Sequence, residues 1–189
     1  DHCEGALRQS ISQMLVDIAD CYPVDYILID ARAGFHDMGG IAAAQIPHGT
    51  VLFGNHSRQS WDGLTQVLRT IAEGHADDMP VAIVDCMCDG ISDTALMARR
   101  QFLQKAYTAC LENYYTEGDE VPGPEAEGVA HSPIYLPFEN DLKRDIMLFS
   151  GGNPNDNARV QELIQRLTGP AYEAIKSRIE TWFGEEENG

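Results

Sequence analysis

One run of the sequence places a carboxylate at the end of an apolar stretch and a glycine shortly after it. Residues 26–34 read YILIDARAG. A strand that is apolar throughout is typical of a parallel sheet, whose carboxyl edge is where such folds bind ligands. Asp30 at that edge can hold Mg²⁺ through water beside nucleotide phosphates. Gly34 lets the backbone approach a terminal phosphate and donate its N–H. Asp30 can instead cap the following turn, and the residues alone leave both roles open.

Four short apolar runs are spaced along the chain in a way that predicts the sheet needed to position these residues. They lie at 26–29, 50–53, 81–84 and 134–136. Amphipathic helical patterns precede the first run and separate the later ones, with clear apolar stripes such as Trp61, Leu64, Leu68 and Ile71. Alternating strands and helices at this spacing indicate right-handed βαβ units. We therefore predict an α/β fold with a parallel sheet of four neighbouring strands flanked by helices.

The remaining segments suggest how the chain is organised. Residues 116–132 are rich in Gly, Pro and Glu, which predicts a mobile surface loop. A Gly-Gly-Asn-Pro-Asn break near residue 151 separates a predicted α/β domain at 1–150 from a helical segment at 151–189 that packs on it. A parallel sheet normally begins with a strand, yet the opening residues have a helical pattern. We expect the first strand of the sheet, and the loop that follows it, to be missing from these residues.

The run that ends at Asp30 resembles the Walker B and switch region of the ParA/MinD-like ATPases, deviant-Walker-A members of the SIMIBI class of P-loop NTPases. Three later runs, NHSRQSWDGL at 55–64, VAIVD at 81–85 and IYLPF at 134–138, are similar to later elements of that family in order and spacing. The resemblance spans roughly residues 25–148. The sequence DARAG at 30–34 most resembles the corresponding segment of a variant branch of the family, whose phosphate-binding loop resembles KGGVGR.

The resemblance implies a role for each candidate site residue. Asp30 would be the catalytic residue and would hold Mg²⁺, through water, while Gly34 would meet the γ-phosphate of ATP. Asp85, Pro137 and Phe138 would flank the base. The family's phosphate-binding loop, a KGGxG[K/R][S/T] run, does not occur in the sequence. We therefore expect Mg²⁺ and ATP to be bound in a protein that carries this loop, and expect neither cofactor for these residues alone.

Several other residues allow two interpretations each. Asp85 stands where many relatives have Asn, and it can also simply cap a turn. His36 and Asp37 form a candidate base and orienter, although adjacent turn residues rarely face one another, and Asp37 can instead complement a helix dipole. Arg32 suits either a phosphate or surface carboxylates. The aromatic pair at 182–183 suits either the core or a partner protein.

The composition restricts the partners and the compartment. The formal net charge is −17, from 13 basic and 30 acidic residues, and such a surface repels nucleic-acid phosphate and anionic lipid. A DNA mimic is the alternative that charge alone permits. Five scattered cysteines argue for a reducing compartment, and Cys86 and Cys88 are predicted to be buried structural thiols. Without an apolar run long enough to span a bilayer, or a visible signal peptide, we expect a cytoplasmic protein.

Two functions from different classes follow. The first is an ATP-binding and ATP-hydrolysing switch that controls a partner protein or a homodimer, with these residues as its C-terminal portion. ATP hydrolysis then requires a phosphate-binding loop upstream. The second is a non-catalytic acidic interaction module on a degenerate NTPase fold.

Overall fold

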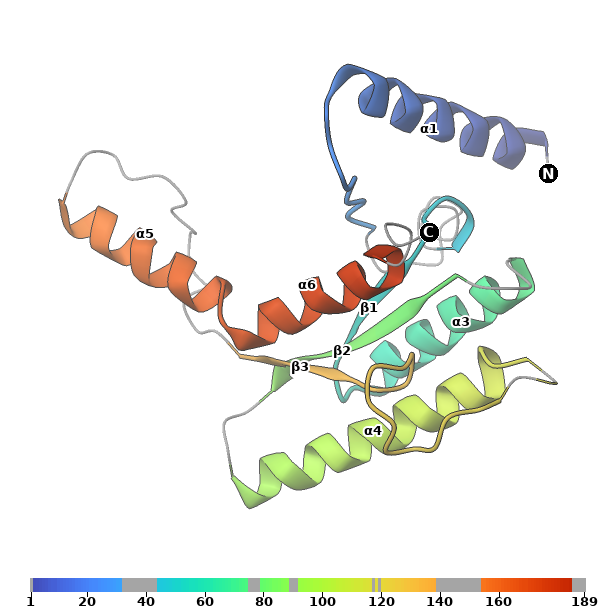
Figure 1. The fold of residues 1–189 in the computed structure, drawn as a ribbon. Coiled ribbons are helices and arrows are strands. Elements are labelled where there is room, and N and C mark those ends of the chain that lie inside the picture. The colour runs from blue at the N-terminus through green and yellow to red at the C-terminus, as the bar shows by residue number, and fades with distance from the viewer. Residues whose placement is uncertain are drawn as a thin grey trace.

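The computed structural model describes residues 2–31, 44–74, 79–88, 92–116, 118, 120–138 and 154–184. Its elements, in chain order, are α1 (His2–Cys21), β1 (Thr50–Gly54), α3 (Arg58–Gly74), β2 (Val81–Cys88), α4 (Asp93–Asn113), β3 (Ile134–Pro137), α5 (Pro154–Leu167) and α6 (Pro170–Phe183). Figure 1 shows a small sheet at the centre, with α3 and α4 on one side of it and α6 on the other.

The sheet has three parallel strands in the order β1-β2-β3. In β1 and β2, Thr50 pairs with Val81 and Gly54 with Asp85. In β2 and β3, Val84 pairs with Ile134. The central strand is buried almost throughout, which its continuous apolar sequence predicts. The predicted α/β class and three of the four predicted parallel strands are confirmed.

The fourth predicted strand, at 26–29, is wrong. Residues 22–31 are irregular, and the run is open to solvent, with Leu28 83% exposed. The continuous apolar pattern predicted a buried strand. A strand also requires a neighbouring strand that completes its backbone hydrogen bonds, and an apolar pattern does not reveal whether one is present. Among the described strands β1 pairs with β2 alone, and this run does not join its other edge. Asp30 therefore does not lie at the end of a strand.

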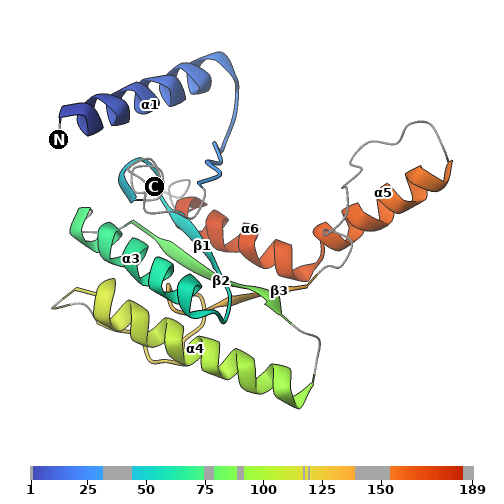
Figure 2. The same ribbon diagram turned by 180° about the vertical axis from the view of Figure 1, so that it is seen from behind.

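Two apolar layers hold the helices on the sheet. On one face, the predicted stripe of α3 is buried together with Phe102 of α4 and with Val81 and Ile83 of β2. On the other face, Tyr172 and Ile175 of α6 pack against a cluster that includes Val84. Figure 2 shows the same three layers from behind. The outer helices thus fix the sheet from both sides.

Local signals set two helix starts. The Ser92 hydroxyl accepts a hydrogen bond from Ala95 N at 3.1 Å, capping α4. Pro170 occupies the first turn of α6, where its missing N–H costs nothing.

The segment after α4, residues 116–132, is a loop as predicted, with no helix or strand at its described positions. It is, however, anchored to the core. The Tyr115 hydroxyl and His131 Nδ1 share a hydrogen bond of 2.6 Å, and His131 Nε2 donates to Gly123 O at 3.0 Å. His131 is fully buried, so its ring ties the loop to the end of α4. The prediction of a mobile loop missed this anchor, because composition does not reveal a single buried histidine.

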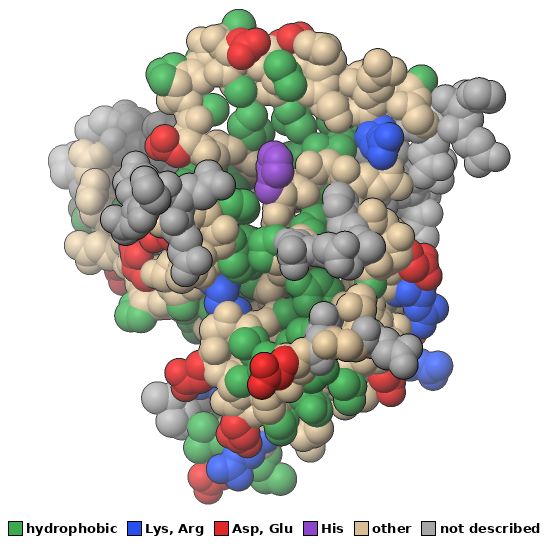
Figure 3. Space-filling view, turned by 45° about the vertical axis from the view of Figure 1, so that its right-hand side comes forward, with side chains coloured by type: hydrophobic (Ala, Val, Ile, Leu, Met, Phe, Trp, Pro, Cys, Tyr) green, Lys and Arg blue, Asp and Glu red, His purple; other side chains and the backbone are tan. Residues whose placement is uncertain are grey.

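Two helices extend from this core. Figure 1 shows α1 and α5 set apart from the layers that enclose the sheet. The stripe predicted for α1 is half-buried at Leu7, Ile11, Leu15 and Ile18, but its fifth member, Met14, is exposed. No side chain described in that helix is fully buried. Figure 3 shows hydrophobic side chains on the side of this topmost helix that faces the rest of the molecule. None of the helices in the described ranges is long and apolar enough to cross a membrane.

Candidate functional site

The carboxyl edge of the sheet brings a buried carboxylate and a histidine together. Asp85 of β2 is fully buried, and its Oδ2 lies 3.3 Å from Nε2 of His56, which follows β1. The loop that carries His56 is fixed by short hydrogen bonds. Asn55 N donates to Ser60 Oγ at 2.9 Å, and Ser57 N donates to Asn55 Oδ1 at 2.8 Å. This loop therefore presents the imidazole to Asp85 while starting α3.

An arginine and a tyrosine complete the surroundings of Asp85. The guanidinium carbon of Arg99, on α4, lies 5.0 Å from the ring centroid of Tyr135, on β3. The Tyr135 hydroxyl donates to the backbone oxygen of Arg99 at 3.4 Å. Within the described part of the chain, neither Asp85 Oδ1 nor Arg99 Nε has a hydrogen-bond partner, although both are buried. Unsatisfied buried polar atoms are uncommon in folded proteins and concentrate at functional sites.

A bulge in β2 shapes the same edge. Asp85 pairs with Tyr135 and Cys88 with Pro137, so β2 has one residue more than β3 between these pairs. Met87 adopts a left-handed backbone conformation with φ of 61°. The extra residue reverses the alternation of the strand, so that Cys88 lies on the same face as Asp85 and its thiol donates to Asp85 O at 3.2 Å.

Burial dominates the electrostatics of this site. Loss of solvent raises the pKa of Asp85 above its ordinary value, while the His56 imidazole, the Cys88 thiol and the Arg99 charge partly oppose the shift. Burial also raises the pKa of Cys86 to about 11 and that of Cys88 to about 12. Both thiols are therefore protonated at neutral pH, which makes them poor nucleophiles. Cys88 is buried as predicted, and Cys86 is half-buried.

The raised pKa of Asp85 predicts a pH-dependent stability. A carboxyl group whose pKa is higher in the folded state stabilises the fold most at low pH, and this contribution is lost as pH rises through the folded-state value. Asp85→Asn removes the titration and keeps an uncharged side chain of similar shape. We expect the variant to gain stability relative to wild type as pH rises above the ordinary pKa of aspartate. Denaturant unfolding across this pH range measures the difference.

Asp62→Asn, at an exposed carboxylate on α3, is the matched control. It should leave the pH profile close to that of wild type. Identical pH profiles for wild type and Asp85→Asn would contradict the expectation.

The predicted base-flanking residues meet at this edge. Pro137 pairs with Cys88, and Phe138 N donates to Cys88 O at 3.0 Å, within three residues of Asp85 along β2. The Asp85 carboxylate, however, points into the α3 and α4 layer, where it contacts His56. The Asp85 side chain is therefore connected to the carboxyl edge of the sheet through its contact with His56.

Asp30, the predicted metal residue, is not joined to this cluster. Asp30 is exposed in the irregular segment, while Gly34, Arg32, His36 and Asp37 lie outside the described residues. No group of three or more potential metal ligands occurs in the described ranges. Mg²⁺ beside a nucleotide takes one or two carboxylates, with phosphates and waters as its other ligands. An exposed carboxylate such as Asp30 is compatible with that role.

Sequence reasoning missed three members of the site: His56, Arg99 and Tyr135. His56 carried a usable signal, because it lies three residues beyond the end of the strand predicted at 50–53. Arg99 gave none, since it sits within a helical pattern that looks solvated.

Comparisons with protein-family models, with curated proteins and with solved structures find no significant match for this chain. The resemblance to ParA/MinD-like ATPases therefore stays a prediction that rests on the residues quoted for it.

Proposed function

We propose that these residues form the base-side portion of an ATP-dependent switch, which binds and hydrolyses ATP when a phosphate-binding loop is present in the same protein. The observation that carries the proposal is the cluster at the carboxyl edge of a parallel sheet. There, Pro137 and Phe138 contact Cys88, three residues beyond the buried Asp85 on the same strand. Parallel α/β folds bind their ligands at this edge.

Within the proposal each residue has a task of its own. Asp30 holds Mg²⁺ through water, Gly34 contacts the γ-phosphate, and Pro137 with Phe138 lies beside the base. When bound, Mg²⁺ neutralises charge on the phosphoryl group that is transferred.

The contacts of Asp85 suggest how binding would be transmitted. Asp85 is linked through His56 to the start of α3, and the charge of Arg99 on α4 acts on it. A ligand that disturbs the strand ends would thus act on both helices that cover one face of the sheet. Such a displacement would carry the signal to a partner protein or to a second copy of the chain, because packed helices shift between discrete arrangements.

Nucleotide binding tests the proposal. Phosphate affinity in such folds comes largely from the amides and the lysine of the phosphate-binding loop. We expect residues 1–189 alone to bind Mg·ATP at least about 100-fold more weakly than a protein in which such a loop precedes them. Isothermal titration calorimetry with both chains measures this difference. Tight, magnesium-dependent binding to residues 1–189 alone would place the phosphate site elsewhere, and no binding to the longer protein would reject the proposal.

The alternative is a non-catalytic acidic interaction module. It is favoured by the exposure of the apolar run at 26–29 together with the net charge of −17. An exposed apolar patch on an acidic protein is typical of a surface that meets another protein. Absence of nucleotide binding in the longer protein would favour this function over the switch.

A further inference from the structure

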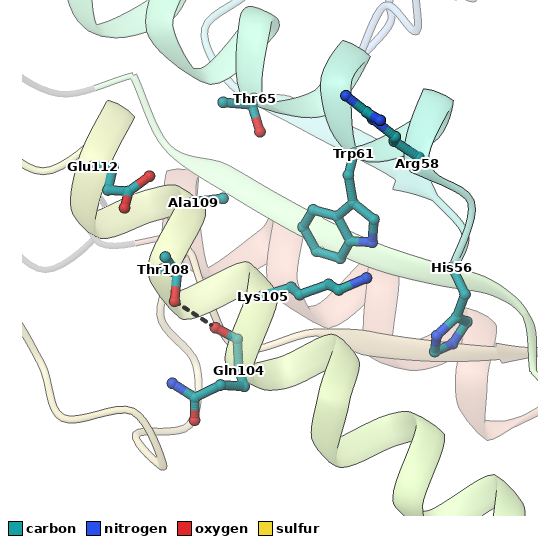
Figure 4. A pocket seen from close by; sticks show the side chains of 9 residues that line it. All are labelled: His56, Arg58, Trp61, Thr65, Gln104, Lys105, Thr108, Ala109 and Glu112. Atoms are coloured by element: carbon teal, nitrogen blue, oxygen red, sulfur yellow. Dashed lines mark hydrogen bonds between the residues drawn. The ribbon is translucent and has the colours of Figure 1, made fainter.

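A shallow groove runs between α3 and α4, on the surface of the helical layer that covers Asp85. Its volume is about 440 Å³. Figure 4 shows the side chains that line it, with Trp61 at the centre and Lys105 crossing beside it. The groove is separate from the strand ends at Pro137 and Phe138, and His56 is the residue that it shares with the Asp85 site.

A buried hydrogen-bond donor in this groove lacks an acceptor. Trp61 is only 9% exposed, and its indole Nε1 has no hydrogen-bond partner among the described residues. An indole N–H can only donate, so it requires an oxygen or another acceptor. Phe102 holds the indole in place, with ring centroids 4.7 Å apart. The donor is thus fixed in position before any ligand binds.

A positive charge lies beside this donor. Lys105 Nζ is 5.8 Å from the centroid of the Trp61 ring. In Figure 4 the indole nitrogen and the ammonium group are on the same side of the ring, toward His56. Arg58 also lines the groove, and Glu112 is the acidic residue that lines it. In a chain with a net charge of −17, the Lys105 ammonium beside an unpaired N–H donor forms a local site for negative charge, while the Arg58 guanidinium lies 3.7 Å from the Asp62 carboxylate.

We propose that this groove binds the oxyanion head group of a small organic acid, either a carboxylate or a phosphate ester. Two oxygens of such a group can accept from Trp61 Nε1 and from the Lys105 ammonium together, and bonds to a charged donor are the stronger kind. The indole face and Ala109 give the groove an apolar wall, which suits a ligand whose body is aromatic or aliphatic. The proposal does not depend on ATP binding at the strand ends.

The test uses the two tryptophans of the chain as a paired reporter. Proton–nitrogen correlation spectra resolve the indole N–H of Trp61 from that of Trp182, and the loss of one peak in Trp61→Phe assigns them. We expect millimolar phenyl phosphate or benzoate to shift the Trp61 peak with saturation while leaving the Trp182 peak unmoved. Saturation by phenyl phosphate alone identifies a phosphate ligand, and saturation by benzoate alone identifies a carboxylate ligand.

Two lysine variants separate a site from general charge attraction. Lys105→Met keeps the apolar stem and removes the charge, and should weaken binding by about 10-fold or more. Lys176→Met, on α6 outside the groove, should leave binding unchanged. The proposal fails if neither probe gives a saturable shift, if sodium chloride of the same ionic strength gives the same shift, or if Lys105→Met binds as well as wild type.

Discussion

Asp30→Ala should reduce ATP turnover by about 100-fold or more in a protein that carries a phosphate-binding loop ahead of these residues, because loss of a metal ligand costs several kcal/mol in the barrier. The same change should barely alter the melting temperature. The Asp30 side chain is exposed in an irregular segment, so it has little packing to lose. If Asp30 serves only as a turn residue, the cost is about 1 kcal/mol or less, all of it in stability.

Steady-state phosphate release and thermal melting of the same variant distinguish the two roles of Asp30. Asp25→Ala is the matched control, because Asp25 is an exposed carboxylate in the same irregular segment. It should change neither turnover nor melting. Near-normal turnover in Asp30→Ala would assign Asp30 to the turn and would favour the interaction module.

Phe102→Ala should lower the free energy of unfolding by about 3–5 kcal/mol, the range for removing a buried aromatic side chain. Phe102 is fully buried at the centre of the larger core. Its ring lies 4.7 Å from that of Trp61 and 5.3 Å from that of His56, measured between centroids. The cavity would therefore also loosen Trp61, which lines the groove, and His56, which contacts Asp85. Denaturant unfolding at neutral pH measures the loss.

Leu111→Ala is the control on the same helix, since Leu111 is about half exposed. It should cost about 1 kcal/mol or less. An equal loss in both variants would show that the core is not centred on Phe102.

Much of the fold follows from short-range patterns in the sequence. The stripe of α3 is buried where its period of 3.6 residues requires, and the three continuous apolar runs pair as parallel strands. The Ser92 cap and Pro170 set helix starts through interactions within a few residues. Each of these signals depends on residues that are close together in the sequence, so it can be recognised without knowing the tertiary contacts.

The face that α4 buries was harder to predict. Large residues such as Leu96 and Tyr107 define an apparent stripe, but Leu96 is 46% exposed. The buried face instead carries Phe102 between small residues, including Ala95 and Ala106. Alanines allow the helix to approach the sheet closely, and a search for large apolar residues overlooks them. The close approach depends on the partner surface, which the helix sequence does not specify.

The site itself depends on contacts between distant residues. His56 and Asp85 are separated by 29 positions, and Tyr135 lies on a third element. Strand register brings them together, and it leaves no clear pattern in the sequence. Asp85 was predicted to follow directly after a strand at 81–84, but β2 continues to Cys88. The burial of Asp85 and its contact with His56 could be found only in three dimensions.

The bulge in β2 also bears on how this fold can evolve. Pairing with β1 uses Val81 to Asp85, all before the bulge, whereas pairing with β3 extends past it to Cys88. An insertion or deletion just after Asp85 would therefore leave the β1 ladder in register. It would change which side chains face the helices at the carboxyl edge, because a shift of one residue exchanges the two faces of a strand. Length changes at this point can thus vary the lining of the edge while leaving the pairing of β1 with β2 intact.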